Sequence, residues 1–276
     1  MALARKGDFD GSSMNRISFD SEILDQMNAG NSKDQSLSAY DSKTARASYM
    51  GRINYNYAQK YLAEFNLRRD GSENFAPSKR WGTFMSASLG WVLSEEKFFE
   101  KLKKTVNFLK IRASYGTLGN DNTGGVAFPY YSRFELYSGA TASNYLPNNL
   151  GDYVFGSLLT KGLVPGAVAN AMATWEKSTK TNIAMDATLF NRLNLTVDFF
   201  MERRTDILVQ RYDEVPSSFG GTLPLENLGE VKNKGVDFSL SYHQKVREVD
   251  FTLGGNFTFA RNKIVEMAEA VGTSEY

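Results

Sequence analysis

The chain has 276 residues, and its 32 Lys and Arg nearly balance its 31 Asp and Glu, so the net charge is +1. This balance gives no argument for a nucleic-acid-binding surface. The absence of cysteine excludes disulfides, thiolate metal sites and a cysteine nucleophile. No run approaches the roughly 18 apolar residues of a transmembrane helix, whereas a transmembrane β-strand needs only about 9–11 alternating residues. Composition therefore leaves a membrane β-sheet open.

The beginning of the chain shows neither a targeting segment nor a strand pattern. The opening MALARKGDFDG lacks the apolar core of a signal peptide, so we expect either a cytosolic protein or a chain whose true N-terminus is missing. Residues 1–46 are polar, mixed in charge and without a sustained period. We interpret 1–46 as a polar, extracellular loop segment and 47–276 as part of a β-barrel, on the strand patterns and the resemblance described below.

Alternation of apolar and polar residues begins after this segment. It runs over 48–57 and again over 61–68, which is the signal of two half-buried strands. A three-residue turn at 58–60 would pair Tyr57 with Tyr61 and keep the apolar side chains on one face. The Gly, Pro and Ser content of 70–80 predicts a loop, and the alternation over 81–91 predicts a third strand.

Residues 94–108 interrupt the two-residue period. Phe98, Phe99, Leu102 and Val106 recur at roughly helical spacing, and Ser94 precedes them in the position of an N-cap. We therefore predict a short helix here, followed by a strand over 109–116. The stretch 119–174 is rich in Gly, Asn and Tyr, has no period, and is longer than ordinary connections.

The clearest alternation runs from residue 181 to 204, on both sides of one break. A three-residue loop at 190–192 would pair Leu189 with Leu193 and Met185 with Val197, whereas a two-residue loop would split the apolar set between two faces. Asn191 tolerates the left-handed conformation that such a loop usually needs. The sequence therefore predicts a tight hairpin with one apolar and one polar face.

Two further strands, over 236–242 and 249–259, follow a loop at 207–229 and are joined by 243–248, which brings the total to eight. The joins alternate between short (58–60, 92–108, 190–192, 243–248) and long (70–80, 119–174, 207–229). Short turns on one rim and long loops on the other are typical of an outer-membrane barrel. Aromatic residues gather at the strand ends, as a membrane-interface girdle requires: Tyr57, Tyr61, Trp81, Trp91 and Tyr242. A soluble β-sandwich would also alternate, but it does not predict this asymmetry.

Small residues on the polar face argue against a complete eight-stranded barrel, whose narrow interior needs filling. They are Gly82, Ser86, Ser88, Gly90, Ser114, Gly116 and Gly254. We therefore predict the all-β fold of a transmembrane antiparallel up-and-down β-barrel segment. About eight strands of a larger barrel would form an open, curved sheet in isolation, with its first and last strands unpaired.

Charged residues fall on the polar face of the predicted strands. We expect six of them to face a barrel lumen: Arg52, Glu64, Arg68, Arg112, Asp186 and Asp198. Paired carboxylates are also compatible with acid–base catalysis, but a hydrated lumen needs polar side chains without any catalytic role.

The long loop carries an aromatic set that could stack on sugars or peptides, or pack against the loop itself or a partner protein. The residues are Tyr130, Tyr131, Phe134, Tyr137, Tyr145 and Tyr153. His243 is the only histidine and is expected at a turn. Asp121 and its neighbours loosely resemble a calcium loop but lack its ligand spacing, so we expect a turn at the start of a loop. We predict no catalytic, cofactor or metal site, and no enzyme.

Four stretches, in order, resemble SusC/RagA-family TonB-dependent transporters. They are GRINYNYAQKYLAEFNLRRDGSENFAPSKRWGTFMSASLGWVLSEEKFF at 51–99, FLKIRASYGTLGND at 108–121, ATWEKSTKTNIAMDATLFNRLNLTVDFF at 173–200 and LGEVKNKGVDFSLSY at 228–242. Four ordered matches across about 190 residues are specific, although none would mean much alone.

The resemblance implies a plugged outer-membrane barrel of about 22 strands in a Gram-negative bacterium. It implies import of a glycan or peptide substrate, a SusD-like surface lipoprotein as partner, and energy delivered through TonB. It also implies that the plug, the TonB-contacting segment and further strands are missing from this sequence. The alternatives are a passive outer-membrane porin and a soluble carbohydrate-binding β-sandwich.

Overall fold

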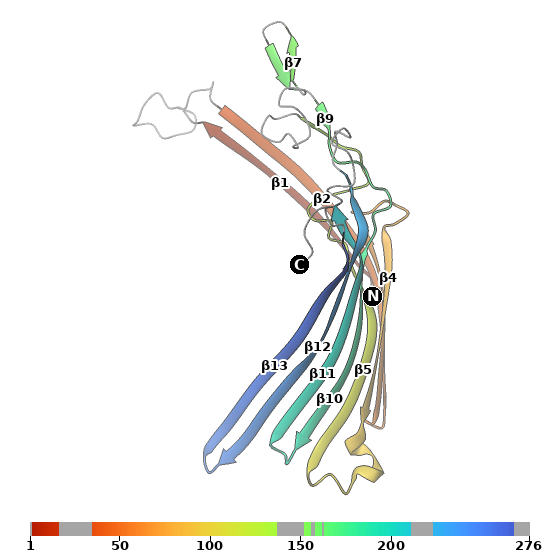
Figure 1. Ribbon diagram of the computed structural model, residues 1–276, viewed down its shortest axis with the longest axis vertical. Coiled ribbons are helices and arrows are strands. Elements are labelled where there is room, and N and C mark those ends of the chain that lie inside the picture. The colour runs from red at the N-terminus through yellow and green to blue at the C-terminus, as the bar shows by residue number, and fades with distance from the viewer. Residues whose placement is uncertain are drawn as a thin grey trace, which may run out of the picture.

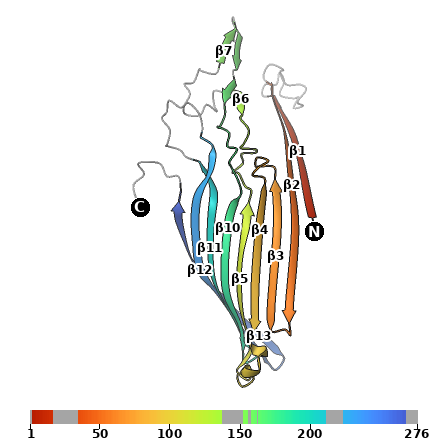
Figure 2. The same cartoon turned by 90° about the vertical axis from the view of Figure 1, so that its right-hand side faces the viewer.

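The computed structural model describes residues 2–16, 35–136, 152–155, 158–161, 163–210 and 223–267. Its main feature is one curved antiparallel sheet of nine strands (Figures 1 and 2). In spatial order the strands are β1 (Ala2–Arg16), β2 (Gln35–Tyr57), β3 (Tyr61–Ser72), β4 (Trp81–Val92), β5 (Val106–Asn120), β10 (Glu176–Leu189), β11 (Leu193–Gln210), β12 (Leu225–Val246) and β13 (Val249–Glu266). The sheet is open, because β1 and β13 are its two edges. All eight strands predicted from the sequence are present, and β1 is a ninth.

The two hairpins with three-residue turns have the predicted register. Tyr57 pairs with Tyr61, Leu189 with Leu193, and Met185 with Val197. Asn191 has the expected positive φ of 54°, and Phe190 before it has a φ of 53°. The last hairpin turns more tightly than predicted. Val246 pairs with Val249, so β12 runs through most of the segment that was expected to join two strands.

The interpretation of residues 1–46 as loop is wrong. Residues 2–16 form β1, and 35–46 form the first half of β2. These two strands pair with each other from Ala2↔Tyr49 to Arg16↔Gln35, whereas β3 pairs only with residues 46–57 of β2. The β1–β2 hairpin therefore extends the sheet at the end where the long loops lie. The sequence of this hairpin does not alternate between apolar and polar residues, so the period test could not detect it.

The helix predicted at 94–108 is also wrong. Two short 3₁₀ turns, η3 (Leu93–Glu95) and η4 (Lys97–Phe99), occupy its start, and β5 begins already at Val106. Ser94 makes no capping hydrogen bond, and its buried hydroxyl has no hydrogen-bond partner among the described residues. Without a cap the first turn stays in 3₁₀ form, which accommodates only short pieces.

The long stretch 119–174 contains two short pairs of antiparallel strands that are separate from the main sheet. Within 119–174, β6 (Phe134–Leu136) pairs with β9 (Leu163–Pro165), and β7 (Asp152–Phe155) pairs with β8 (Leu158–Lys161). Both hairpins lie at one end of the sheet in Figures 1 and 2, opposite the tight turns. The sheet therefore has a loop end and a turn end.

The two faces of the sheet differ in character. The apolar side chains of the alternating strands are largely exposed, as shown by Ile183 at 55%, Phe199 at 59% and Leu253 at 76%. The main buried cluster lies on the opposite face near the loop end and contains Phe75, Phe84, Ala173 and Trp175. A sheet that exposes its apolar face to its surroundings is unlike a soluble sandwich, in which that face forms the core. No helix in the described ranges is long and apolar enough to cross a membrane.

Candidate functional site

The polar face of the sheet carries an ion-pair network centred on Arg112 of β5. Its Nε lies 3.0 Å from Asp186 Oδ2, and its Nη2 lies 3.0 Å from Asp198 Oδ1. The register explains the second contact, because Arg112 pairs with Ala184 and Ala184 pairs with Asp198. The small Ala184 side chain lets the guanidinium group pass over β10 to reach β11. Asn182 Nδ2 also donates to Asp198 at 3.3 Å.

A second polar group lies on β2 and β3. Arg52 Nη2 contacts Glu64 Oε2 at 2.6 Å, and Asn66 Nδ2 donates to the other oxygen of that carboxylate at 2.7 Å. Further along β3, Arg68 Nε contacts both oxygens of Asp70, at 2.8 and 2.6 Å. The Arg52–Glu64 ion pair therefore joins two neighbouring strands, and the Arg68–Asp70 pair lies within one strand.

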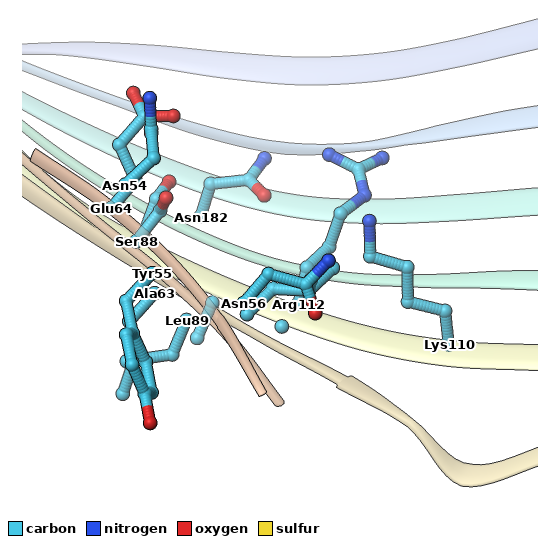
Figure 3. A pocket seen from close by; sticks show the side chains of 14 residues that line it. Asn54, Tyr55, Asn56, Ala63, Glu64, Ser88, Leu89, Lys110, Arg112 and Asn182 are labelled. Carbon is cyan, nitrogen blue, oxygen red and sulfur yellow. The ribbon is translucent and has the colours of Figure 1, made fainter. Parts of the chain in front are cut away.

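All six residues predicted to face a lumen thus lie on one face, in separate groups. Two of the six, Glu64 and Arg112, border a hollow of about 520 Å³ (Figure 3). Other polar residues at this hollow are Asn54, Ser88, Lys110 and Asn182. The hollow exists because the row from Glu64 to Asn182 passes through Ser88 and Ser114, whose side chains are short. Figure 3 also shows Tyr55 on the opposite side of the sheet from Arg112 and Lys110.

This arrangement suits a hydrated lining better than catalysis. The guanidinium group of Arg112 separates the two carboxylates, and Arg52 and Asn66 occupy the Glu64 carboxylate. An acid–base pair would need one carboxylate free to exchange a proton with a substrate. No group of metal-ligating side chains occurs among the described residues.

The aromatic candidates of the long loop are only partly brought together. The rings of Tyr130 and Tyr131 are 4.4 Å apart and border a hollow of about 750 Å³ together with Phe128, Trp81 and Arg80. Burial, followed by a hydrogen bond with Tyr131, raises the pKa of Tyr130. Phe134 is exposed in β6 and does not border this hollow. Tyr153 belongs to β7, and Tyr137 and Tyr145 lie outside the described residues.

Sequence reasoning missed two features of the loop end. Asp121 does not stand in an open turn, because Arg46 Nε contacts its Oδ2 at 2.8 Å and Ser72 Oγ donates to the same oxygen at 2.7 Å. Trp175 packs between Phe75 and Phe84, with both ring centroids 5.5 Å away, and its indole donates to the Arg80 carbonyl at 3.0 Å. In the sequence, the isolated Trp175 before a strand was the only available signal of the buried cluster.

The expected position of His243 at a turn is wrong, because β12 continues past it.

Comparison with known proteins decides the family. The family described as "TonB dependent receptor-like, beta-barrel" matches residues 5–274, which is nearly the whole chain. The chain belongs to this family. The match confirms the resemblance drawn from the four sequence stretches, and because it begins at residue 5 it includes β1 as well as the alternating strands. Members of the TonB-dependent receptor family are outer-membrane proteins.

Curated TonB-dependent receptors share a substantial part of the sequence. TonB-dependent receptor P3 of Formosa agariphila is 34% identical over 227 residues, covering 82% of this chain and 21% of that protein. TonB-dependent receptor SusC of Bacteroides thetaiotaomicron is 31% identical over 232 residues, covering 83% of this chain and 22% of SusC. The chain thus spans about a fifth of the length of these TonB-dependent receptors.

Solved structures of a peptide importer and a siderophore receptor share the fold. The RagAB peptide importer in its "open-open" state superposes with a TM-score of 0.78 at 22% identity, covering 100% of this chain and 28% of that one. The siderophore receptor PirA from Pseudomonas aeruginosa superposes with a TM-score of 0.52 at 14% identity. At these identities the likeness is one of fold alone.

Proposed function

We propose that the chain forms part of the wall of an outer-membrane TonB-dependent transporter that actively imports glycans or peptides. In this proposal a surface lipoprotein of the SusD type serves as partner, and TonB delivers the energy. The name of RagAB as a peptide importer supports a peptide substrate, and the names of the TonB-dependent receptors support TonB as the energy source. The arrangement of side chains on the apolar face of the sheet supports its placement in the outer membrane.

An apolar band on the outer face lies between two rows of aromatic rings. Near the turn end, Tyr61 stacks with Tyr57 and Trp91, with both pairs of ring centroids 6.4 Å apart. Near the loop end, Tyr49 stacks with Trp81 at 5.9 Å. Aromatic rings at both interfaces of a membrane, with apolar side chains between them, are the pattern of a lipid-facing barrel wall.

The spacing of the two rows fits a membrane. Trp81 and Trp91 are the two ends of the outer face of β4. Ten residues of a strand rise by about 33 Å, which a tilt of 35–45° reduces to a height of about 25 Å. This equals the typical height of the apolar band of an outer-membrane barrel. The polar face would then border a hydrated lumen, and the β1–β2 hairpin and long loops would stand outside the cell.

Uptake by cells that carry the full-length protein tests import against passive diffusion. We expect uptake of a labelled oligosaccharide or oligopeptide panel to disappear when the encoding gene, or the gene for TonB, is deleted. A protonophore should abolish the same uptake. Uptake that continues without TonB, together with stable conductance in planar bilayers, would instead establish the passive porin.

A further inference from the structure

The outer face of β11–β13 becomes basic near the loop end. In one row across these strands, Met201 pairs with Lys234, and Lys234 pairs with Arg261. In the next row, Arg203 pairs with Lys232, and Lys232 pairs with Lys263. These residues share the parity of Val197 and Phe257, so their side chains leave the sheet on the apolar face. The basic patch is defined here as Lys232, Lys234, Arg261 and Lys263.

The basic patch surrounds a hollow. Its four cations and Met201 border a depression of about 660 Å³. All four basic residues are exposed, and they come from two adjacent strands that hold them in a fixed register. A depression of this volume is large enough for a lipid headgroup.

Among the described residues, carboxylates neutralise only part of the positive charge of the patch. Glu230 contacts Arg203 at 2.8 Å and Lys232 at 3.3 Å, and thereby compensates part of this sector. Glu266 of β13 pairs in register with Glu230, beyond the two rows that carry the patch. Within the described ranges, no carboxylate lies within ion-pair distance of Lys234, Arg261 or Lys263. Three adjacent cations therefore face outward without a carboxylate partner among the described residues, and they are available to an anion from outside the chain.

The depth of the patch identifies the anion. On β13, the outer residues from Phe251 to Phe259 are apolar or Gly, and Arg261 follows them directly. The ten residues from Phe251 to Arg261 rise by about 33 Å along the strand, or about 25 Å in height at the usual tilt. The cations thus begin where the apolar band ends on its loop side. In a membrane this is the depth of lipid headgroups, not of the hydrocarbon.

We propose that the basic patch binds the phosphate groups of an anionic lipid of the outer leaflet. The inference rests on the proposed placement of the sheet in the outer membrane. Lys ammonium groups and the planar fork of Arg both bind phosphate well, and clusters of such residues beside a membrane favour anionic lipids. The opposite sector of the rim differs, because there Arg69 lies over the Trp81 ring, with its Cζ 5.4 Å from the ring centroid. Lipid binding is therefore expected on the β12–β13 sector.

The test uses the full-length protein in phosphatidylcholine nanodiscs that contain either phosphorylated or dephosphorylated lipid A. Native mass spectrometry and phosphate analysis measure the lipid that stays bound. We expect the wild type to retain phosphorylated lipid A preferentially. The triple variant Lys234→Gln/Arg261→Gln/Lys263→Gln should bind it roughly a hundredfold more weakly, since each of the three cations near an anionic surface contributes about a fivefold factor.

A matched control removes the same charge at the other rim. Lys97, Lys101 and Lys104 are exposed residues at the turn end, and the triple variant Lys97→Gln/Lys101→Gln/Lys104→Gln should bind lipid A like the wild type. Single variants such as Lys234→Gln, which leave most of the patch in place, should bind lipid A about fivefold more weakly and provide a second measure if the triple variant folds poorly.

Several outcomes would overturn the inference. Equal retention by the wild type and the patch triple variant would do so, as would an equal loss in both triple variants. A change from oligomer to monomer in the patch variant, with lipid preference unchanged, would assign the patch to a protein contact instead. A spin label at Phe257 separates this inference from the proposed function. Lipid contact at 257 without phosphate preference defeats only the headgroup site, whereas water contact at 257 defeats the membrane placement itself.

Discussion

Arg112 of β5 and Asp198 of β11 lie on strands that are not neighbours, yet their side chains meet at 3.0 Å. Ala184 of β10 stands between them in register, and it is only 2% exposed because the bridging guanidinium group covers it. Three strands are thereby joined by one cation on the polar face. The contact depends on a residue that carries no charge.

Replacing Ala184 with a larger side chain should therefore break this bridge. In Ala184→Leu, the isobutyl group would occupy the path of Arg112 and force it to a new rotamer, at a cost of about 1–3 kcal/mol in the free energy of unfolding. Urea unfolding of the full-length protein in lipid vesicles measures the change. Ala113→Leu is the matched control, because Ala113 is exposed on the apolar face and an added alkyl group there would contact lipid. Equal destabilisation by both substitutions would contradict the role of Ala184 as a gap.

The two faces of β11 should differ at adjacent residues. Val197→Arg in the full-length protein should destabilise the barrel by about 2–4 kcal/mol if the residue lies near the bilayer midplane, because a cation there loses its hydration. Spin labels at 197 and 198 give a direct reading, with expected contact to lipid-soluble relaxants at 197 and to water-soluble relaxants at 198. The reverse pattern would mean that the face carrying Asp198 contacts lipid and the face carrying Val197 contacts water. Asp198 would then not face the lumen.

How far the sequence could lead is best seen at the strand ends. Parity alone correctly placed Leu189 opposite Leu193 and Tyr57 opposite Tyr61, because a one-residue slip would have moved a whole apolar set to the wrong face. The same reasoning could not predict the strand at residues 2–16, because the sequence there has no alternating apolar set from which to infer a register. It also extended helical spacing from Phe98 to Val106 although the chain forms only short 3₁₀ turns there.

The polar face was predictable in part for a similar reason. The parity of Arg112, Asp186 and Asp198 placed them on one face, but their partnership depends on the stagger between three strands and on the small size of Ala184. The buried contact of Trp175 with Phe75 and Phe84 joins residues about 90 to 100 positions apart, so no local pattern indicates it. The basic residues of β12 and β13 are evident in the sequence, but only the strand register shows that they are neighbours on one face of the sheet.

Acid should loosen the turn that joins β4 and β5. The Glu96 carboxylate accepts hydrogen bonds from Tyr61 Oη at 2.8 Å and Trp91 Nε1 at 3.3 Å, and it contacts Lys60 Nζ at 3.2 Å. The hydrogen bond from Tyr61, followed by those from Lys60 and Trp91, lowers the pKa of Glu96 below its ordinary value of 4.5. Because the folded-state pKa is lowered, the stabilisation is fully present above pH 4.5 and is lost as the pH falls through the folded-state pKa.

A spin label at the exposed residue Lys101 reports on this turn. Its mobility should be low and constant above pH 4.5 and should rise in more acidic buffer. Glu96→Gln should make the label mobile at every pH, since the amide cannot replace the charge-assisted contacts. Glu95→Gln serves as control, because Glu95 is exposed and, among the described residues, forms an ion pair only with Lys103, at 3.7 Å. A pH profile that Glu96→Gln leaves unchanged would refute the assignment.

The 276-residue chain alone should not form a pore. Residues 50–57 of β2 pair only with β3, and β13 pairs only with β12, so both edges offer unpaired backbone groups at the level of the apolar band. Unpaired N–H and C=O groups in hydrocarbon cost several kcal/mol each, and exposed edges pair with other chains. We therefore expect the isolated chain to aggregate in detergent and to give no conductance in planar bilayers.

The full-length protein, purified in the same detergent, is the control and should be monodisperse. Hydrogen exchange should show rapid exchange along the outer edges of β2 and β13 before aggregation. A monodisperse isolated chain with both edges protected would mean that the sheet closes on itself, and would favour the small porin over a segment of a wider wall.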